Sequence, residues 1–171
     1  MAAAAKDAIA LLKADHRKVE HLFAQFEKAK AKSRKKTLAD QICLELTVHT
    51  KIEEDVFYPG CRDEGVGEDL MNEAYVEHDG AKVLVREIEK GDPDGKYYDS
   101  QVKVLSEMIK HHVKEEEKKQ GNMFAKAKKA GVDTKTLGKQ MAAEKKKLVA
   151  EYKKSGLPKP PTPTFKGTQL A

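Results

Sequence analysis

Residues 49–53 read HTKIE and residues 112–116 read HVKEE, so the chain twice places a histidine four residues before a glutamate. Residues four apart lie one above the other on the same face of an α-helix. Both pairs sit within segments whose apolar residues recur at helical spacing, and both fall on the apolar face. The repeated spacing therefore predicts two helices that carry the same polar pair into a protein core.

Helical periodicity extends outward from these two pairs over most of the chain. Turn-forming sequence interrupts it at YPGCRDEGVG, residues 58–67, and at KGDPDGK, residues 90–96. Long helices joined by short loops pack as antiparallel neighbours, so the pattern predicts an all-α, up-down-up-down four-helix bundle. The expected helices cover about residues 6–30, 34–58, 68–90 and 97–128.

The sequence after residue 128 predicts one additional C-terminal helix and a tail. Asp133 is a suitable N-cap for a helix over about residues 134–153, because its carboxylate can accept a hydrogen bond from a free backbone N–H. The stretch GLPKPPTPTFKGTQLA is rich in proline and poor in apolar residues, which favours an extended, mobile end. We expect one domain over residues 1–153 and a disordered, flexible tail over residues 154–171.

Composition indicates a soluble protein of the cytoplasm. The 171 residues suit a single domain, and 36% of them are charged, as in soluble helical proteins. The net charge of +5 comes largely from lysine runs that alternate with alanine and acids, so we interpret them as solvated helix faces and expect no nucleic-acid partner. The two cysteines show no metal or disulfide spacing, and no apolar run suits a signal peptide or a membrane span.

The six histidines separate into two groups when each expected helix is drawn at about 100° per residue. His21 and His111 fall away from the apolar stripes, whereas the other four point inward, one from each helix. On the fourth helix this geometry favours His112 with Glu116 over the neighbouring pair of His111 with Glu115. The inward polar residues are His16, His49, Glu53, His78, His112 and Glu116.

Six polar side chains in a core need partners, because a buried carboxylate without one is costly. Hydrogen bonds among histidine and glutamate could satisfy two pairs, but they do not explain why four histidines converge at one depth. Four imidazoles and two carboxylates exceed the needs of one tetrahedral zinc and suit iron, with each glutamate able to bridge two ions. The pattern predicts a di-iron site, and Glu45, which shares the stripe, stays open as a ligand or a partner of His49.

The order His16, HTKIE, His78, HVKEE resembles the hemerythrin family, in particular its bacterial HHE cation-binding branch, over roughly residues 6–152. The resemblance implies a metal-binding four-helix bundle that holds two non-haem iron ions with an oxo or hydroxo bridge. It also implies the role of each side chain. The imidazole ligands would be His16, His49, His78 and His112, and the bridging carboxylates would be Glu53 and Glu116.

The chain departs from the oxygen-carrying hemerythrins on the third helix. Those proteins place a second histidine one turn from the first, but the residues four before and four after His78 are Ala74 and Lys82. One imidazole fewer leaves more coordination positions for water or for exogenous molecules. Tyr75, one turn before His78, would either fill the position or be a half-buried core tyrosine.

Three functions fit this sequence, and we favour the first. It is a di-iron protein that binds a diatomic ligand, oxygen or nitric oxide, for sensing, storage or scavenging. The second is a di-iron enzyme that decomposes peroxide or handles nitric oxide, or a protein that donates iron for cluster repair. The third is a metal-free helical module that binds an acidic partner through its basic faces. Because no general base or nucleophile lies outside the metal site, any catalysis would belong to the iron.

Overall fold

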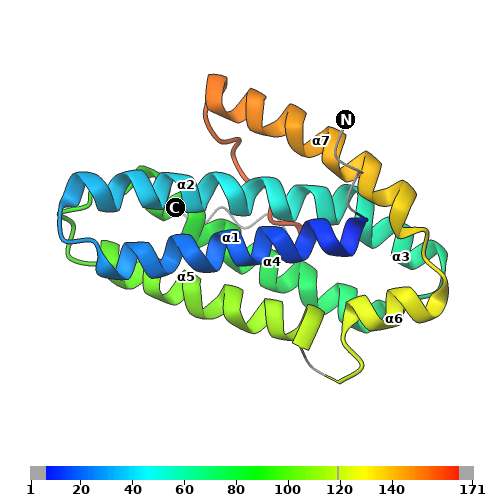
Figure 1. The fold of residues 1–171 in the computed structure, drawn as a ribbon. Coiled ribbons are helices and arrows are strands. Elements are labelled where there is room, and N and C mark those ends of the chain that lie inside the picture. The colour runs from blue at the N-terminus through cyan, green and yellow to red at the C-terminus, as the bar shows by residue number, and fades with distance from the viewer. Residues whose placement is uncertain (1–6, 119, 166–171) are drawn as a thin grey trace.

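The computed structural model describes residues 7–118 and 120–165. Its framework is a bundle of four long helices in which α1 contacts α2, α2 contacts α4, α4 contacts α5 and α5 contacts α1 (Figure 1). Short connections join these helices in chain order, so the predicted all-α bundle is confirmed. The four helices are α1 (Ala8–Lys28), α2 (Lys32–Ile52), α4 (Glu68–Lys90) and α5 (Tyr98–Val113).

Side-chain caps fix the starts of several helices. The Asp7 carboxylate accepts a hydrogen bond of 2.8 Å from the backbone N–H of Ala10, which begins α1. The Asp133 carboxylate does the same for α7 (Thr134–Ser155) through a 3.0 Å bond from the N–H of Thr136. The N-cap predicted from the sequence is therefore present, and α7 begins at the predicted residue.

Two of the expected helices are not continuous. At Glu53 the second helix passes into a π-helical segment, Glu53–Phe57, which leads into α3 (Tyr58–Asp63). The helix α5 likewise passes into a second π-helical segment, Lys114–Lys118. A separate helix, α6 (Met123–Ala130), follows. The first π segment begins at Glu53, the glutamate of its histidine–glutamate pair, and the second begins between His112 and Glu116. Such local widening of a helix is frequent at functional sites.

The apolar core is divided by the layer that holds the inward polar residues. One buried cluster includes Leu12 and Met71 and extends to α6 and α7, and the other includes Val19 and Leu105 and fills the opposite half of the bundle. On α1, His16 lies between Leu12 of the first cluster and Val19 of the second. Apolar packing on both sides therefore holds the polar layer at a fixed depth.

The C-terminal part of the chain packs against the bundle. The helix α7 lies across α1 and α2, and the chain then returns to α4, where it ends in a short 3₁₀ turn, Pro163–Phe165 (Figure 1). The sequence predicted a disordered tail over residues 154–171. The structure places its described part against the bundle, and residues 166–171 lie outside the described residues. In the described part of the chain, no helix has the length and apolar character needed to cross a membrane.

Candidate metal centre

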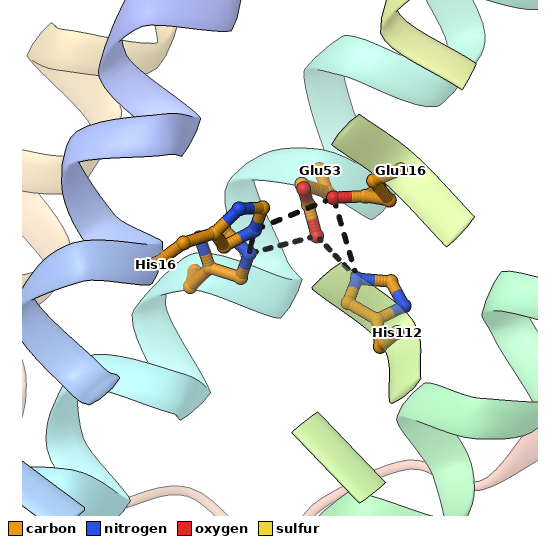
Figure 2. Close-up of side chains that lie close together, drawn as sticks. His16, Glu53, His112 and Glu116 are labelled. Atoms are coloured by element: carbon orange, nitrogen blue, oxygen red, sulfur yellow. Dashed lines mark hydrogen bonds and ion pairs between the residues drawn. The ribbon is translucent and has the colours of Figure 1, made fainter. Parts of the chain in front are cut away.

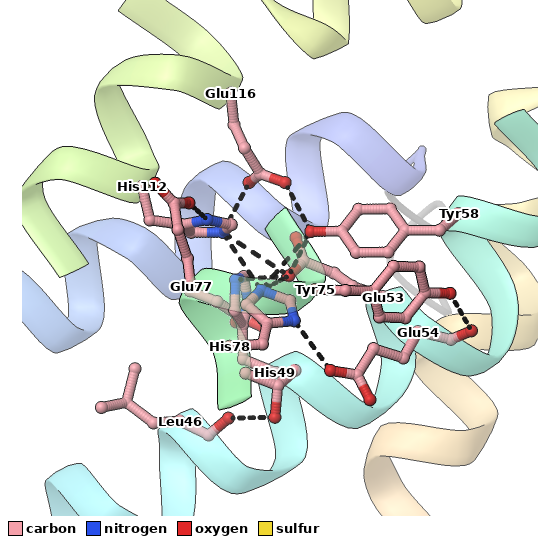
Figure 3. A network of polar contacts seen from close by, with 12 residues as sticks. Leu46, His49, Glu53, Glu54, Tyr58, Tyr75, Glu77, His78, His112 and Glu116 are labelled. Carbon is pink, nitrogen blue, oxygen red and sulfur yellow. Dashed lines mark hydrogen bonds and ion pairs between the residues drawn. The ribbon is translucent and has the colours of Figure 1, made fainter. Parts of the chain in front are cut away.

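The structure brings all six inward polar residues together in one buried layer. Each of α1, α2, α4 and α5 supplies one histidine, and the two glutamates follow the histidines of α2 and α5 by one turn. Figure 2 shows His16, His112 and the two glutamates of this layer, and Figure 3 adds His78. None of the six is more than 4% exposed. They are His16, His49, Glu53, His78, His112 and Glu116.

The four imidazole rings form two pairs. The Nε2 atoms of His16 and His49 lie 3.2 Å apart, and we call these residues the first pair. The Nε2 atoms of His78 and His112 lie 3.3 Å apart, and these residues are the second pair. In both pairs the nitrogen that faces the centre is Nε2, so all four rings present the same atom to the interior.

Each glutamate contacts one histidine of each pair. Glu53 Oε2 lies 3.3 Å from the Nε2 atoms of the α2 and α4 histidines. Glu116 Oε2 lies 3.4 Å from the Nε2 atoms of the α1 and α5 histidines. The two carboxylates therefore lie between the two imidazole pairs, where they and the four Nε2 atoms could serve as metal ligands.

Buried polar atoms that lack a hydrogen-bond partner indicate whether metal ions fit this site. Among the described residues, Glu53 Oε1 is a buried oxygen that accepts no hydrogen bond, and Glu116 Oε2 accepts none although it lies 3.4 Å from two imidazole nitrogens. A buried acceptor without a partner costs about 1–3 kcal/mol, more when it is charged. Cations coordinated by these oxygens would remove that cost, and the set of imidazole nitrogen and carboxylate oxygen donors suits iron. The residues therefore fit a metal centre.

The charges of the cluster are strongly coupled. Burial alone would lower the pKa of His112, but the negative charge of Glu116 and its contact with the ring raise that pKa well above its usual range. Burial alone would raise the pKa of Glu116, but His112 and His16 lower it well below its usual range. Each of these two groups therefore favours the charged form of the other, and a cation that bound His112 would compete with its proton.

Tyr58 belongs to the centre and was missed by the sequence analysis. Its hydroxyl donates a 3.0 Å hydrogen bond to Glu116 Oε1 and lies 3.4 Å from His78 Nε2 (Figure 3). Because the side chain is fully buried beside two carboxylates, the pKa of its hydroxyl is raised well above its usual value, so the group keeps its proton and donates a hydrogen bond. Tyr75, which the sequence singled out, is half-buried, and its hydroxyl lies 3.5 Å from the backbone oxygen of Glu54.

A carboxylate faces the outer nitrogen, Nδ1, of every histidine in the centre (Figure 3 shows two of them). At His78 and His112 this contact is a hydrogen bond, which favours the tautomer with a proton on Nδ1 and leaves Nε2 free to bind a metal. The Nδ1 atoms of His16 and His49 face their carboxylates without a hydrogen bond. Each carboxylate is next in sequence to one inward residue but serves the histidine of another helix. The contacts are Glu117 with His16 at 3.4 Å, Asp15 with His49 at 3.7 Å, Glu54 with His78 at 2.9 Å and Glu77 with His112 at 2.8 Å.

The remaining candidates lie outside the cluster. Glu45 pairs with Lys18 at 2.5 Å and points away from the centre. The His111 side chain is 60% exposed and lies 3.3 Å from Glu77, and His21 is exposed on α1. The structure thus separates His111 from His112 as the helical wheel predicted.

Replacing His111 with alanine is expected to leave metal content almost unchanged, because its ring lies at the surface. The matched variant His112→Ala should lose much of the metal, since it removes one imidazole of the second pair and one of the two imidazole contacts of Glu116. Metal analysis of both purified variants checks this. Loss of metal in the His111 variant with retention in the His112 variant would show that the wrong histidine has been assigned to the centre.

The chain belongs to the hemerythrin HHE cation binding domain family, whose model matches residues 7–124. The fold agrees with that assignment. The crystal structure of a hemerythrin HHE cation binding domain-containing protein from Mycobacterium kansasii superposes with a TM-score of 0.72 and covers 89% of this chain and 95% of that one. Its sequence is 20% identical, so the likeness shows the shared fold.

A DNA nickase from Nostoc sp. (strain PCC 7120) is 30% identical over 107 residues, which are 63% of this chain. The matched region spans 30% of the length of the nickase. The fold, the family and the buried cluster of histidines and glutamates together identify a metal-binding domain of the hemerythrin type.

Proposed function

We propose that this protein holds two non-haem iron ions with an oxo or hydroxo bridge and binds a diatomic ligand, oxygen or nitric oxide, for sensing, storage or scavenging. The observation that carries the proposal is the position of the two glutamates. Each glutamate contacts one imidazole of the first pair and one of the second pair, so a single carboxylate can serve both metal ions.

The protein donors leave coordination positions free for a ligand. Four imidazoles and two bridging carboxylates supply four donors to each ion if each carboxylate gives one oxygen to either ion, whereas octahedral iron takes six. Iron bound there would supply those open positions and a reversible change of oxidation state. The four histidines and two glutamates would hold the ions, and Glu54 and Glu77 fix the Nδ1 protons of His78 and His112 on the outer side of the rings.

An enclosed cavity lies against the four histidines. Its volume is about 10 Å³, close to the space that one water-sized molecule needs, and its other walls include Val19, Leu46 and Ile109. The lining does not include Glu53, Glu116 or Tyr58, so the cavity and the tyrosine hydroxyl lie at different sides of the cluster. The volume of this space is close to that of one small molecule.

Tyr58 supports a second candidate, the decomposition of peroxide. Its hydroxyl lies within hydrogen-bonding reach of Glu116, which places one proton donor inside the centre. A hydrogen bond donated at that point would stabilise negative charge on an oxygen atom as an oxygen–oxygen bond breaks. The DNA nickase activity of the Nostoc relative is not expected of this protein on these grounds, because the matched region is only 30% of the nickase.

Binding of nitric oxide to the iron-loaded protein under nitrogen tests the proposal. We expect a new absorption band that saturates at a fixed ratio of nitric oxide to iron, and no such band in metal-free protein. The same sample supplied with peroxide would show no sustained turnover if binding is the function, whereas rapid turnover would favour the enzyme. If the protein holds two iron ions but its spectrum responds to neither oxygen nor nitric oxide, diatomic ligand binding is not its function.

A further inference from the structure

Asp79 is a buried carboxylate that the metal centre does not use. It follows His78 in sequence, its exposed fraction is 0%, and both of its oxygens have partners. Oδ1 accepts a 3.0 Å hydrogen bond from the Lys82 ammonium group. Oδ2 accepts two bonds from Thr164, one of 2.8 Å from the backbone N–H and one of 2.5 Å from the hydroxyl. The C-terminal end of the described chain thus docks on a buried charge.

Asp79 is connected to the centre through Lys82 and Glu54. Lys82 Nζ lies 2.7 Å and 2.9 Å from the two carboxylate oxygens of Glu54. Glu54 Oε1 in turn lies 2.9 Å from His78 Nδ1. The Lys82 and Glu54 side chains are only 11% and 16% exposed, so water screens these contacts weakly. A continuous set of charged contacts therefore leads from Thr164 to a histidine of the second pair.

A similar connection starts from α7 and ends on the first pair. The Lys145 ammonium group donates a hydrogen bond to Asp15 Oδ1. Asp15 Oδ2 lies 3.7 Å from His49 Nδ1. Burial would raise the pKa of Asp15, but its contacts with His49 and Lys145 hold that pKa below its usual value, as expected for a carboxylate that keeps its charge.

Both connections begin beyond residue 124, where the family match ends. We call residues 134–165, which comprise α7 and the chain that follows it, the C-terminal segment. Its last part also forms a wall, with Leu157 and Pro160, of a cavity of about 240 Å³ whose opposite wall includes Glu54 and Lys82. The segment thus lies over the same groups that contact His78.

We propose that the C-terminal segment supports the metal centre, with Thr164 positioning His78 and Lys145 positioning His49. The proposal rests on the proposed function in that these histidines hold metal. Without the Thr164 hydroxyl, Asp79 Oδ2 loses one of its two donors and keeps only the backbone N–H, which is costly for a buried carboxylate. Lys82 is then drawn toward Asp79 and away from Glu54, and the ring of His78 loses the fixed partner of its Nδ1. Loss of such an outer contact typically weakens metal binding about 10- to 100-fold.

Two pairs of variants test the positioning roles in the full-length protein. Thr164→Val keeps the shape of the side chain and removes its hydroxyl, and Thr162→Val is the matched control in the same stretch. Lys145→Met removes the charge that faces Asp15, and Lys146→Met, on the exposed side of α7, is its control. The measured quantity is the rate at which iron passes from the loaded protein to a competing chelator.

We expect Lys145→Met and Thr164→Val each to speed the loss of iron about tenfold, with both control variants matching the parent protein. Thr164→Ser, which restores a hydroxyl, should return the rate to that of the parent. Because either variant could lower global stability, the melting temperature of each is measured beside its release rate. Release rates equal to the parent in both variants would overturn the proposal.

Nuclear magnetic resonance of the metal-free protein separates this proposal from the metal assignment. The imidazole nitrogen signals of His78 should shift in Thr164→Val, while those of His16, which no contact of Thr164 reaches, should not. A parent protein that binds no metal would defeat the proposed function, and the nitrogen signals would still decide whether Thr164 positions the ring. Unchanged His78 signals would overturn its role.

Discussion

Replacement of Glu116 by alanine is expected to remove most of the bound metal. The side chain contacts the α1 and α5 histidines at 3.4 Å and accepts the hydrogen bond of Tyr58, so its loss would remove one of the two carboxylates proposed to bridge the metal ions. Glu53→Ala should act in the same way, because Glu53 is the other carboxylate of the proposal. Iron analysis of the purified variants should give well under half of the metal bound by the parent protein.

Glu45→Ala is the matched control for that experiment. Glu45 lies on the same helix as His49, and the sequence left it open as a ligand, but the structure pairs it with Lys18 at 2.5 Å. The variant should keep its full complement of metal. Circular dichroism of all three variants separates loss of metal from loss of fold. Full metal content in Glu116→Ala would contradict its bridging role, and loss of metal in Glu45→Ala would restore Glu45 as a candidate ligand.

Removal of the metal is expected to lower the melting temperature by on the order of 10 °C. A ligand that binds only the folded state stabilises it by about 4 kcal/mol at a thousand times its dissociation constant, and each kcal/mol shifts the midpoint by about 2–4 °C in a chain of this size. The metal-free protein should still melt cooperatively, because the two apolar clusters on either side of the polar layer do not depend on metal.

Thermal melts of protein verified to be metal-free and of protein loaded with iron check this expectation. Glu116→Ala serves as the control, since iron added to it should shift the midpoint little. Identical midpoints for the two forms of the parent protein would mean that the buried cluster is not coupled to a metal.

The bundle could be predicted because its signals are local. The helix α4 begins and ends at the predicted residues, since its limits coincide with Gly67 and Gly91 and its apolar residues keep strict helical spacing between them. The same spacing placed His16, His49, His78 and His112 on the inner face. A histidine on an apolar stripe can be located from sequence alone as long as the helix that carries it is regular.

The structure differs from the sequence prediction at the points where the helices stop being regular. The π-helical segment after α2 closes with the N–H of Tyr58 bonded to the oxygen of Glu53, five residues earlier. In a regular helix Tyr58 would point about 140° away from Glu53, so the wheel did not select it. The wider turn brings its hydroxyl to 3.5 Å from Glu53 Oε2. Sequence periodicity carries no signal for a single widened turn.

The carboxylates around the histidines were missed for a different reason. Asp15, Glu54, Glu77 and Glu117 each contact a histidine of another helix, so no spacing within one helix reports the pair. A usable signal is their position next to an inward residue. The contact of Thr164 with Asp79 spans 85 residues, and only the folded chain could reveal it.

The central claim is that one buried layer of four histidines and two glutamates holds two iron ions. The most direct measurement is metal analysis of protein purified without added chelator, combined with its optical spectrum. The account predicts two iron ions per chain and the near-ultraviolet absorption of an oxo-bridged diferric centre. One zinc ion per chain, with no iron and no such absorption, would contradict it.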